Sequence, residues 1–295
     1  MSRTTYPLLA QLLLLTGMLL LGWVLAVLLS QALLSAGADP EAHSTLLLTQ
    51  ALSQTAVFLL PSILFTRYVQ EPSRPILRRA DRQTWVFLAA GIVAALLLIP
   101  AVDMLTEWNA GWHWGTPFAE IEARWRQHSA QVAQTTEKLL LIDGGVDLAA
   151  TLLVVAILPA LCEELFFRGI LQQRLAHHWE QHRRPRWMQD HLAVWTVALL
   201  FSLFHGDPFA LMPRWLLGAL LGYLYRFSGN LIVNTGVHCL NNTLIVLIAY
   251  LHQQGVTSLT PQTGLHLPWV ATLLCTTAAA ATMATMAAVA RRHTH

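Results

Sequence analysis

The stretch P-A-L-C-E-E-L-F-F-R at residues 159–168 decides the fold of this chain. It places Glu163, Glu164 and Arg168 inside an otherwise apolar segment, residues 146–173. About 20 apolar residues are enough to cross the hydrocarbon core of a membrane as a helix. A charged side chain at that depth costs at least about 2.5–3.5 kcal/mol, so ionisable residues inside such a segment indicate a functional site.

The composition of the whole chain points to a membrane location. Hydrophobic residues make up 55% of the 295 residues and charged residues 12%, whereas globular proteins contain about 25% charged residues. We therefore expect an all-α fold, a polytopic transmembrane helical bundle whose surroundings are the lipid bilayer. The net charge of +2 comes without a basic run interleaved with aromatic residues, so nucleic-acid binding is not expected.

About eight transmembrane helices can be drawn along the chain. Their approximate bounds are 8–34, 46–68, 85–105, 146–173, 192–205, 213–227, 231–252 and 268–290. The leucine-rich N-terminal run is too long for the apolar core of a signal peptide, so we expect it to remain as the first helix. No linker or internal repeat suggests a second domain, and residues 1–295 are predicted to form a single integral membrane domain.

The basic residues test this topology. With eight spans, most arginines fall on one side of the membrane: Arg3, Arg67, Arg74, Arg78, Arg79, Arg82, Arg168, Arg174, Arg183, Arg184, Arg186, Arg226, Arg291 and Arg292. The opposite side holds only Arg124, Arg126, Lys138 and Arg214. Because loops rich in lysine and arginine stay in the cytoplasm, both termini of this multi-pass protein are predicted to be cytoplasmic.

The external loop at residues 106–138 is the one sizeable segment outside the predicted spans. Apolar residues recur among polar ones between Thr116 and Lys138, which predicts an amphipathic helix on the outer membrane interface. Three tryptophans before it, Trp108, Trp112 and Trp114, suit the role of interfacial anchors. A solvated helical hairpin is the alternative.

The two glutamates of the opening stretch are expected to have different partners. On a helix, residues four apart share a face and immediate neighbours point about 100° apart, so Glu164 can pair with Arg168 while Glu163 cannot. Glu163 is thus left for proton transfer, for which a desolvated carboxylate is suited. Pro159 lies one turn earlier and is expected to kink the helix. The structural alternative is a buried ion-pair network that only holds helices together.

Two later segments carry histidines inside apolar runs. His205 ends one span, four residues after Phe201, and His238 lies three or four residues from Asn234, Asn241 and Asn242. A single histidine at a helix end, such as His205, is more often an interfacial group than a catalytic one. The polar residues around His238 could instead form hydrogen bonds that only hold helices together. However, Glu163, His205 and His238 each lie about 8–14 residues from the cytoplasmic end of a span, or roughly 12–21 Å deep. We expect them to converge on one site.

This set of residues suits hydrolysis. A carboxylate and a histidine can hold and deprotonate water, and facing histidine and asparagine donors can stabilise the oxyanion of an attacked amide. One carboxylate with two histidines, here Glu163, His205 and His238, could instead bind zinc. A thiol nucleophile is a further alternative because Cys162 and Cys239 adjoin these residues, although they point away from the same faces.

At these residues the sequence resembles the CAAX prenyl protease and bacteriocin-processing (Abi) family of intramembrane endopeptidases. The family's motifs E-E-x-x-x-R, F-x-x-x-H and H-x-x-x-N stand here in order as Glu163-Glu164-Leu-Phe-Phe-Arg168, Phe201-Ser-Leu-Phe-His205 and His238-Cys-Leu-Asn241-Asn242. The resemblance covers about residues 140–250, which would form the catalytic core helices.

The resemblance implies a role for each motif residue. Glu163 would be the general base, and His205 would help to orient the water. His238 and Asn242 would form the oxyanion site. Glu164 and Arg168 would support the architecture, with Phe201 and Asn241 as further supporting residues. Members have been described both as metalloproteases and as metal-independent, and we expect no cofactor here, with zinc as the alternative.

The implied substrate is a peptide, a lipidated protein or another membrane protein, and the compact loops resemble those of bacterial members, which suggests a bacterial inner membrane. Two other functions compete with the endopeptidase: a non-catalytic membrane immunity or scaffold protein that retains the fold, and a transporter. The transporter lacks the paired repeats that such folds carry. The sequence predicts no oligomeric state.

Overall fold

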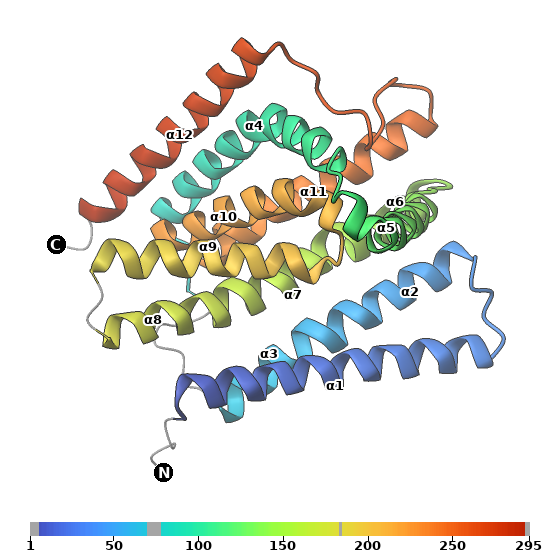
Figure 1. The fold of residues 1–295 in the computed structure, drawn as a ribbon, viewed down its shortest axis with the longest axis horizontal. Helices are drawn as coiled ribbons and strands as arrows, with labels where there is room; N and C mark the ends of the chain where they lie inside the picture. The colour runs from blue at the N-terminus through green and yellow to red at the C-terminus, as the bar shows by residue number, and fades with distance from the viewer. Residues whose placement is uncertain (1–5, 70–77, 183–184, 293–295) are drawn as a thin grey trace.

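The computed structural model describes residues 6–69, 78–182 and 185–292, and every regular element within these ranges is helical (Figure 1). The expected all-α membrane bundle is therefore confirmed. The α-helices, in chain order, are α1 (Leu8–Ser35), α2 (His43–Gln54), α3 (Leu60–Tyr68), α4 (Arg82–Ala110), α5 (Ala119–Leu139), α6 (Gly145–Thr151), α7 (Leu158–Glu164), α8 (Gln173–Gln181), α9 (Arg186–Phe204), α10 (Leu211–Ser228), α11 (Leu231–Gln253) and α12 (Trp269–Arg292).

All eight segments that were predicted to span the membrane are helical. Six helices are long and apolar enough to do so: Leu8–Ser35, His43–Tyr68, Arg82–Ala110, Gly145–Gln181, Leu231–Gln253 and Trp269–Arg292. The other two are α9, whose apolar part Met188–Phe204 is shorter, and α10. They pack against each other, and α10 also packs against α4 and α11, in the middle of the bundle (Figure 1). α10 buries Leu220 and Leu224, among others, and a helix packed inside a bundle needs no continuous apolar face toward lipid.

The helices form three groups in Figure 1. α1 packs against α2 and α3, which are parts of one continuous helix, His43–Tyr68, on one side of the bundle. α4 pairs with α12 on the other side, and the helices from α7 to α11 lie between the two pairs. One buried cluster includes Leu19, Phe65 and Phe167 and joins the first group to the middle. A second cluster includes Phe87 and Leu224 and joins the middle group to α4 and α12. The motif-bearing helices are thereby held from both sides.

Local sequence explains the tight turn between α10 and α11. Gly229 ends α10 in the left-handed conformation, with φ of 60°, which costs glycine little because it has no Cβ. Asn230 then caps α11, because its side-chain oxygen accepts the backbone N–H of Ile232 at 3.1 Å. This turn fixes where α11 starts and therefore how deep His238 lies.

Two of the π-helical segments in the described ranges precede prolines. η1 (Thr55–Leu59) leads to Pro61, and η3 (Leu152–Ile157) leads to Pro159. Proline lacks the N–H that an α-helix needs, and a wider turn before it accommodates the lost bond. A third such segment, η4 (Leu165–Gln172), follows the two glutamates directly and contains Arg168. The helix that carries the opening stretch is thus irregular on both sides of Glu163 and Glu164.

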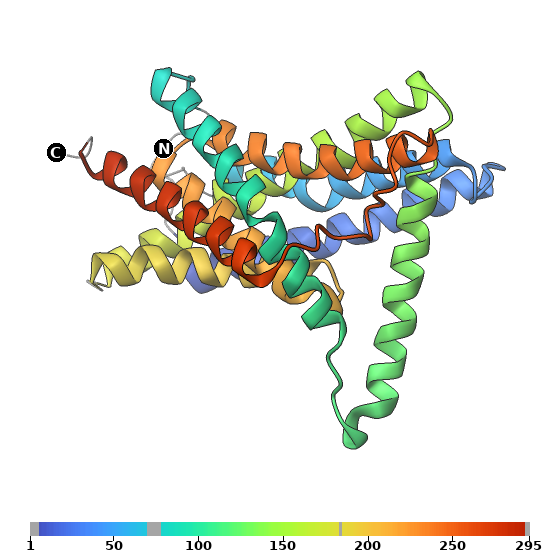
Figure 2. The ribbon, with the colours of Figure 1, turned by 90° about the horizontal axis from the view of Figure 1, so that it is seen from above.

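The external segment contains the predicted helix, α5. Figure 2 shows that α5 runs roughly across the direction of the membrane-spanning helices rather than along them. None of its side chains is buried. Ser129 on α5 donates a hydrogen bond to Asp207 in the turn between α9 and α10 at 2.7 Å. Its orientation agrees with an interfacial helix, and its contact with a membrane stays a prediction.

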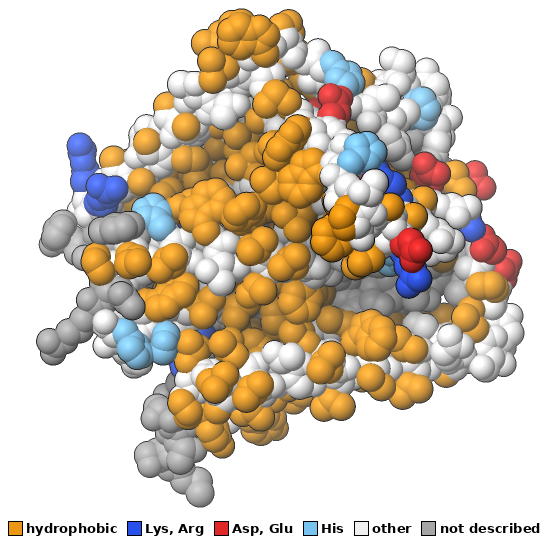
Figure 3. All heavy atoms as spheres, viewed as in Figure 1, with side chains coloured by type: hydrophobic (Ala, Val, Ile, Leu, Met, Phe, Trp, Pro, Cys, Tyr) orange, Lys and Arg blue, Asp and Glu red, His pale blue; other side chains and the backbone are white. Residues whose placement is uncertain are grey.

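Figure 3 shows that orange side chains cover the middle of the face in view and that charged side chains lie toward its two ends. Basic side chains lie where α12 ends, and acidic and basic side chains are mixed around α5. Which end faces the cytoplasm stays a prediction. Four of the arginines on which that prediction depends, Arg3, Arg74, Arg183 and Arg184, lie outside the described residues.

Candidate active site

Glu164 and Arg168 form a fully buried ion pair. Arg168 Nη1 donates to Glu164 Oε1 at 2.6 Å, and both side chains have an exposed fraction of 0%. The second terminal nitrogen, Nη2, donates to the Gly218 carbonyl of α10 at 2.8 Å. The guanidinium also lies 4.8 Å from the centre of the Phe201 ring. The pairing predicted from the four-residue spacing is therefore present, and it ties the helix of the opening stretch to α9 and α10.

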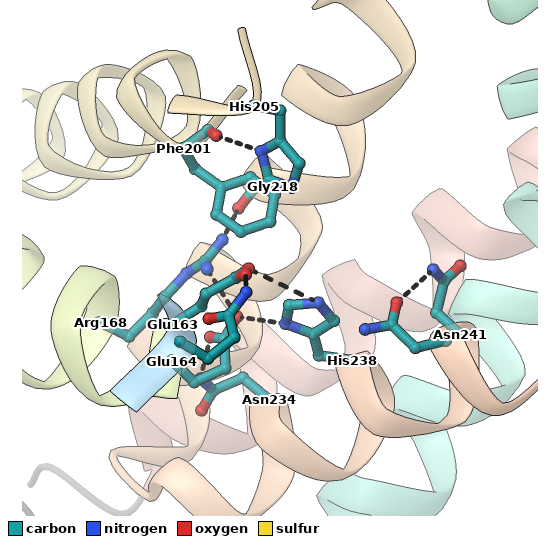
Figure 4. Close-up of polar contacts among 11 residues, drawn as sticks. Glu163, Glu164, Arg168, Phe201, His205, Gly218, Asn234, His238 and Asn241 are labelled. Atoms are coloured by element: carbon teal, nitrogen blue, oxygen red, sulfur yellow. Dashed lines mark hydrogen bonds and ion pairs between the residues drawn. The ribbon is translucent and has the colours of Figure 1, made fainter. Parts of the chain in front are cut away.

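Helix α11 supplies two further partners to Glu164 (Figure 4). Asn234 Nδ2 donates to Glu164 Oε2, and His238 Nδ1 lies 2.9 Å from Glu164 Oε1. A carboxylate paired with arginine can only accept, so His238 Nδ1 carries a proton and donates it. This contact determines which ring nitrogen of His238 is left for other chemistry, namely Nε2.

Glu163 faces that remaining nitrogen. Its Oε2 lies 4.0 Å from His238 Nε2, and its Oε1 accepts a hydrogen bond from Gln54 Nε2 at 3.2 Å. Glu163 is 6% exposed, so it is nearly buried but not sealed off. The two adjacent glutamates thus meet the two nitrogens of one histidine. Sequence reasoning expected Glu163 to lie near His238 and did not identify Gln54.

His205 and His238 both lie against the Phe201 ring (Figure 4). The ring centres of Phe201 and His205 are 4.8 Å apart, and those of Phe201 and His238 are 5.8 Å apart. His205 Nδ1 lies 2.7 Å from the Phe201 carbonyl oxygen, so it is the protonated nitrogen and donates. Among the described residues, His205 makes no hydrogen bond or ion pair with either glutamate, and its side chain is exposed.

Asn242 lies one helical turn beyond His238, on the same face of α11. Its Oδ1 accepts a hydrogen bond from Asn241 Nδ2 at 3.3 Å, which leaves Asn242 Nδ2 as the donor that can face a ligand. Within the described ranges neither asparagine is hydrogen-bonded to a glutamate. The site as folded therefore has a tight centre around the glutamates and His238, with His205 and Asn242 at its edge.

Close packing of α9 against α10 brings Gly218 to Arg168. A Cβ at Gly218 would lie 3.1 Å from Ala198 Cα, so the absence of a side chain allows this approach. The Gly218 carbonyl at this crossing is the one that accepts from Arg168. One turn later on α10, the Gly222 carbonyl accepts a hydrogen bond from Gln172 Nε2 at 2.9 Å.

In the alternative with a bound zinc ion, the side chains of Glu163, His205 and His238 would have to coordinate the same ion. Across the described ranges, no group of three or more histidine, cysteine, aspartate or glutamate side chains is arranged to hold a metal ion. His238 Nδ1 already contacts Glu164, and His205 Nδ1 contacts the Phe201 carbonyl. These side chains as placed do not fit a zinc site, so the mechanism below has no metal-dependent step. The three cysteines are free, and Cys162 is fully buried.

Residues 145–244 match the family model described as type II CAAX prenyl endopeptidase Rce1-like. These residues run from α6 to α11 and include all three motifs. An uncharacterized protein, YpbD, of Bacillus subtilis (strain 168) is 30% identical over 94 residues, which cover 30% of this chain and 39% of that relative. The similarity thus spans well under half of the relative's length. No solved structure matches the chain.

Proposed function

Because residues 145–244 match the Rce1-like model of type II CAAX prenyl endopeptidases, we propose that this protein is an intramembrane endopeptidase with Glu163 as its general base. The observation that carries the proposal is the placement of Glu163 Oε2 and His238 Nε2, which face each other at 4.0 Å. Polar atoms at such a distance are commonly bridged by one water molecule. A water held there would touch the carboxylate that is to accept its proton.

The first step is the attack on the peptide bond. Glu163 Oε2 accepts a proton from the water, and the resulting hydroxide forms a bond to the carbonyl carbon of the substrate. His205 lies at the edge of the site with Nδ1 donating to the Phe201 carbonyl, so Nε2 of the neutral ring can accept a hydrogen. When His238 Nε2 carries a proton and donates to the water oxygen, the second hydrogen of the water is free for His205 Nε2. This arrangement supports the role of His205 in orienting the water.

The second step is collapse of the tetrahedral intermediate. The C–N bond breaks, and Glu163 returns its proton to the leaving amine, so the carboxylate is regenerated. The oxyanion needs N–H donors while it exists. Asn242 Nδ2 is available because Asn241 fixes the orientation of the amide. His238 is the second donor of the proposed oxyanion site, through Nε2 when this nitrogen carries a proton.

The supporting residues hold this geometry in place. Glu164 receives hydrogen bonds from Arg168, Asn234 and His238, so one buried carboxylate sets the positions of η4 and α11 at once. Catalysis depends on reacting groups being placed to within about 1 Å, since a displacement of that size can cost about 100-fold in rate. We assign Glu164 and Arg168 this positioning role.

The proposed substrate is a peptide bond in a peptide, a lipidated protein or a membrane protein. The reacting groups lie among membrane-spanning helices, so the substrate must bring its scissile bond to that depth from the bilayer or its interface. We further propose a location in a bacterial inner membrane, with both termini in the cytoplasm.

The test compares membrane proteomes and peptides from cells that contain the wild-type protein or the Glu163→Gln variant. We expect a defined set of cleavage products that disappears in Glu163→Gln and falls at least about 100-fold in His238→Ala, the range expected when an oxyanion donor is removed. Glu120→Gln, which changes an exposed carboxylate on α5, is the matched control.

The non-catalytic immunity or scaffold protein gives the opposite result. In that case cells retain the function of the protein with Glu163→Gln, His205→Ala and His238→Ala, each folded at the wild-type level, and no product depends on Glu163. That outcome would remove the endopeptidase proposal.

A further inference from the structure

Gln54, the last residue of α2, reaches into the site from outside the family-matched region. Its Nε2 donates to Glu163 Oε1 at 3.2 Å, while the opposite carboxylate oxygen of Glu163 faces His238. The bond therefore restrains rotation of the carboxylate that the proposed mechanism uses. Nothing in the three motifs includes Gln54, since residues 145–244 contain all of them.

The packing of α1 sets the position of Gln54. The π-helical η1 begins directly after Gln54, and its residue Ala56 packs against Gly22 of α1. A Cβ at Gly22 would lie 2.1 Å from the Ala56 carbonyl oxygen, so glycine is needed for this approach. The close contact presses η1 toward the middle of the bundle and holds Gln54 against α7, which α2 also contacts.

The other end of the Gln54 amide has no partner. Its Oε1 is buried and accepts no hydrogen bond from any of the described residues. A buried carbonyl oxygen without a partner is unfavourable, so this oxygen is available to a donor that arrives with a ligand. The nitrogen of the same amide is used for Glu163, so the oxygen cannot be satisfied by exchanging the two atoms without losing that bond.

A cavity lies along Gln54. Its volume is about 270 Å³, and its lining is mostly apolar, including Leu19, Trp23, Val57, Phe58 and Phe204. Phe204 is the neighbour of His205. The cavity thus extends from the residue that holds Glu163 to the end of α9 that carries the second histidine. An extended chain in this space would pass Gln54 on its way to Glu163.

We propose that Gln54 is a further residue of the active site with two tasks. Its Nε2 positions Glu163, and its Oε1 accepts a backbone N–H of the substrate beside the scissile bond. The ligand class is thus an extended peptide backbone, and Gln54 links its binding to the position of the general base. This inference rests on the proposed endopeptidase function.

The first experiment replaces Gln54 with a side chain of similar length that neither donates nor accepts strongly. A synthetic peptide spanning a Glu163-dependent cleavage site is the substrate, and the purified full-length protein is assayed in lipid nanodiscs. For Gln54→Met we expect kcat to fall about 10-fold to 100-fold, as for a misplaced catalytic group, and KM to rise. The matched control is Gln50→Met, one turn earlier on α2, where Gln50 makes no side-chain hydrogen bond within the described part of the chain.

The second experiment tests the contact with the substrate backbone. The same peptide is made with an N-methyl group at each backbone nitrogen in turn. One N-methylated position should raise KM about 10-fold for the wild-type protein and leave KM of Gln54→Met unchanged, because that variant has already lost the acceptor. A purely structural role of Gln54 predicts that both proteins respond equally to every N-methyl group.

Each outcome decides the inference. Wild-type kcat and KM in Gln54→Met, with Glu163→Gln inactive, overturn it and leave the endopeptidase intact. Equal loss in Gln54→Met and Gln50→Met, or equal sensitivity to N-methylation, also overturns it. If the wild-type protein yields no Glu163-dependent product at all, the proposed function fails, and the role of Gln54 fails with it.

Discussion

Glu164 Oε1 and His238 Nδ1 lie 2.9 Å apart, so the carboxylate that pairs with Arg168 also holds the histidine that faces Glu163. One buried group thus serves both the architecture and the proposed chemistry. It joins α7, η4 and α11, and it directs the free nitrogen of His238 toward the neighbouring glutamate. The consequences of this arrangement can be measured.

Replacing Glu164 with glutamine should destabilise the protein strongly. The change leaves the Arg168 charge buried without a counter-ion, and breaking a buried pair in this way typically costs about 3–5 kcal/mol. Thermal unfolding in detergent micelles measures the loss. The matched control is Asp190→Asn, which breaks the partly exposed Arg226–Asp190 pair and should cost at most about 1 kcal/mol.

A double variant separates the charge effect from the packing effect. Glu164→Gln combined with Arg168→Met removes both charges and should be more stable than Glu164→Gln alone. Equal stability of the single and double variants would contradict the buried ion pair described here.

Two glycines of α1 should respond oppositely to alanine. In Gly22→Ala the new Cβ meets the Ala56 backbone, so α1 must move away from η1, and overpacking of this kind costs about 1–3 kcal/mol. In Gly17→Ala the Cβ meets nothing within 4 Å, and the change should be neutral or stabilise the helix by up to about 1 kcal/mol. Melting temperatures of the two variants in the same detergent test this, and a Gly22→Ala protein as stable as Gly17→Ala would refute the close contact.

The start of α5 should loosen in acid. The backbone N–H of Trp114, 2.8 Å away, holds the pKa of the Glu122 carboxyl below its ordinary value, and Arg126 adds to the effect. A carboxyl whose pKa is lower in the folded state stabilises that state above the unfolded value of about 4.3. This stabilisation by Glu122 decreases once the pH falls below about 4.3, and it is lost when the pH is also below the lowered pKa of Glu122 in the folded state.

Fluorine NMR of fluorotryptophan-labelled protein can follow this transition at Trp114, whose ring stacks on Phe209 at 5.6 Å. We expect the Trp114 signal to shift on acidification with a midpoint below about pH 4.3. Glu122→Gln should show the acid-like signal already at neutral pH, whereas Glu120→Gln should keep the wild-type titration. A Trp114 signal that changes neither with pH nor in Glu122→Gln would contradict the coupling between Glu122 and Trp114.

Removal of metal should leave the activity unchanged. Glu163, His205 and His238 are not arranged as one ligand set, and Glu164 already occupies one nitrogen of His238. Protein purified with and without a strong chelator should therefore cleave the Glu163-dependent peptide at equal rates. Elemental analysis finding one tightly bound zinc ion per chain, with activity lost on its removal and restored by zinc, would overturn this prediction.

Much of the fold could be predicted because its signals are local. The eight apolar segments reflect the length that a membrane requires, and each is helical in the structure. The Glu164–Arg168 pair follows from the helical repeat alone, since residues four apart share a face. The helix within residues 106–138 was visible in its alternating apolar and polar positions.

Hydropathy and helical spacing could not predict which helices contact each other. The sequence placed Glu163, His205 and His238 at similar depths, but depth does not determine how helices rotate about their axes. In the structure that rotation brings His238 to both glutamates and packs both histidines against the Phe201 ring. Gln54 was missed although it is a polar residue in the second apolar span, because only packing of α2 on α7 gives it a partner.

The sequence by itself determined that this chain is a helical membrane protein and that Glu163, Glu164 and Arg168 form its polar centre. Hydropathy and helical spacing are properties of neighbouring residues, so they can be obtained without coordinates. Only the tertiary structure decided which groups meet these three. Gly22, Gly218 and the π-helical turns set how closely the helices approach, and those distances direct Gln54 and His238 to Glu163.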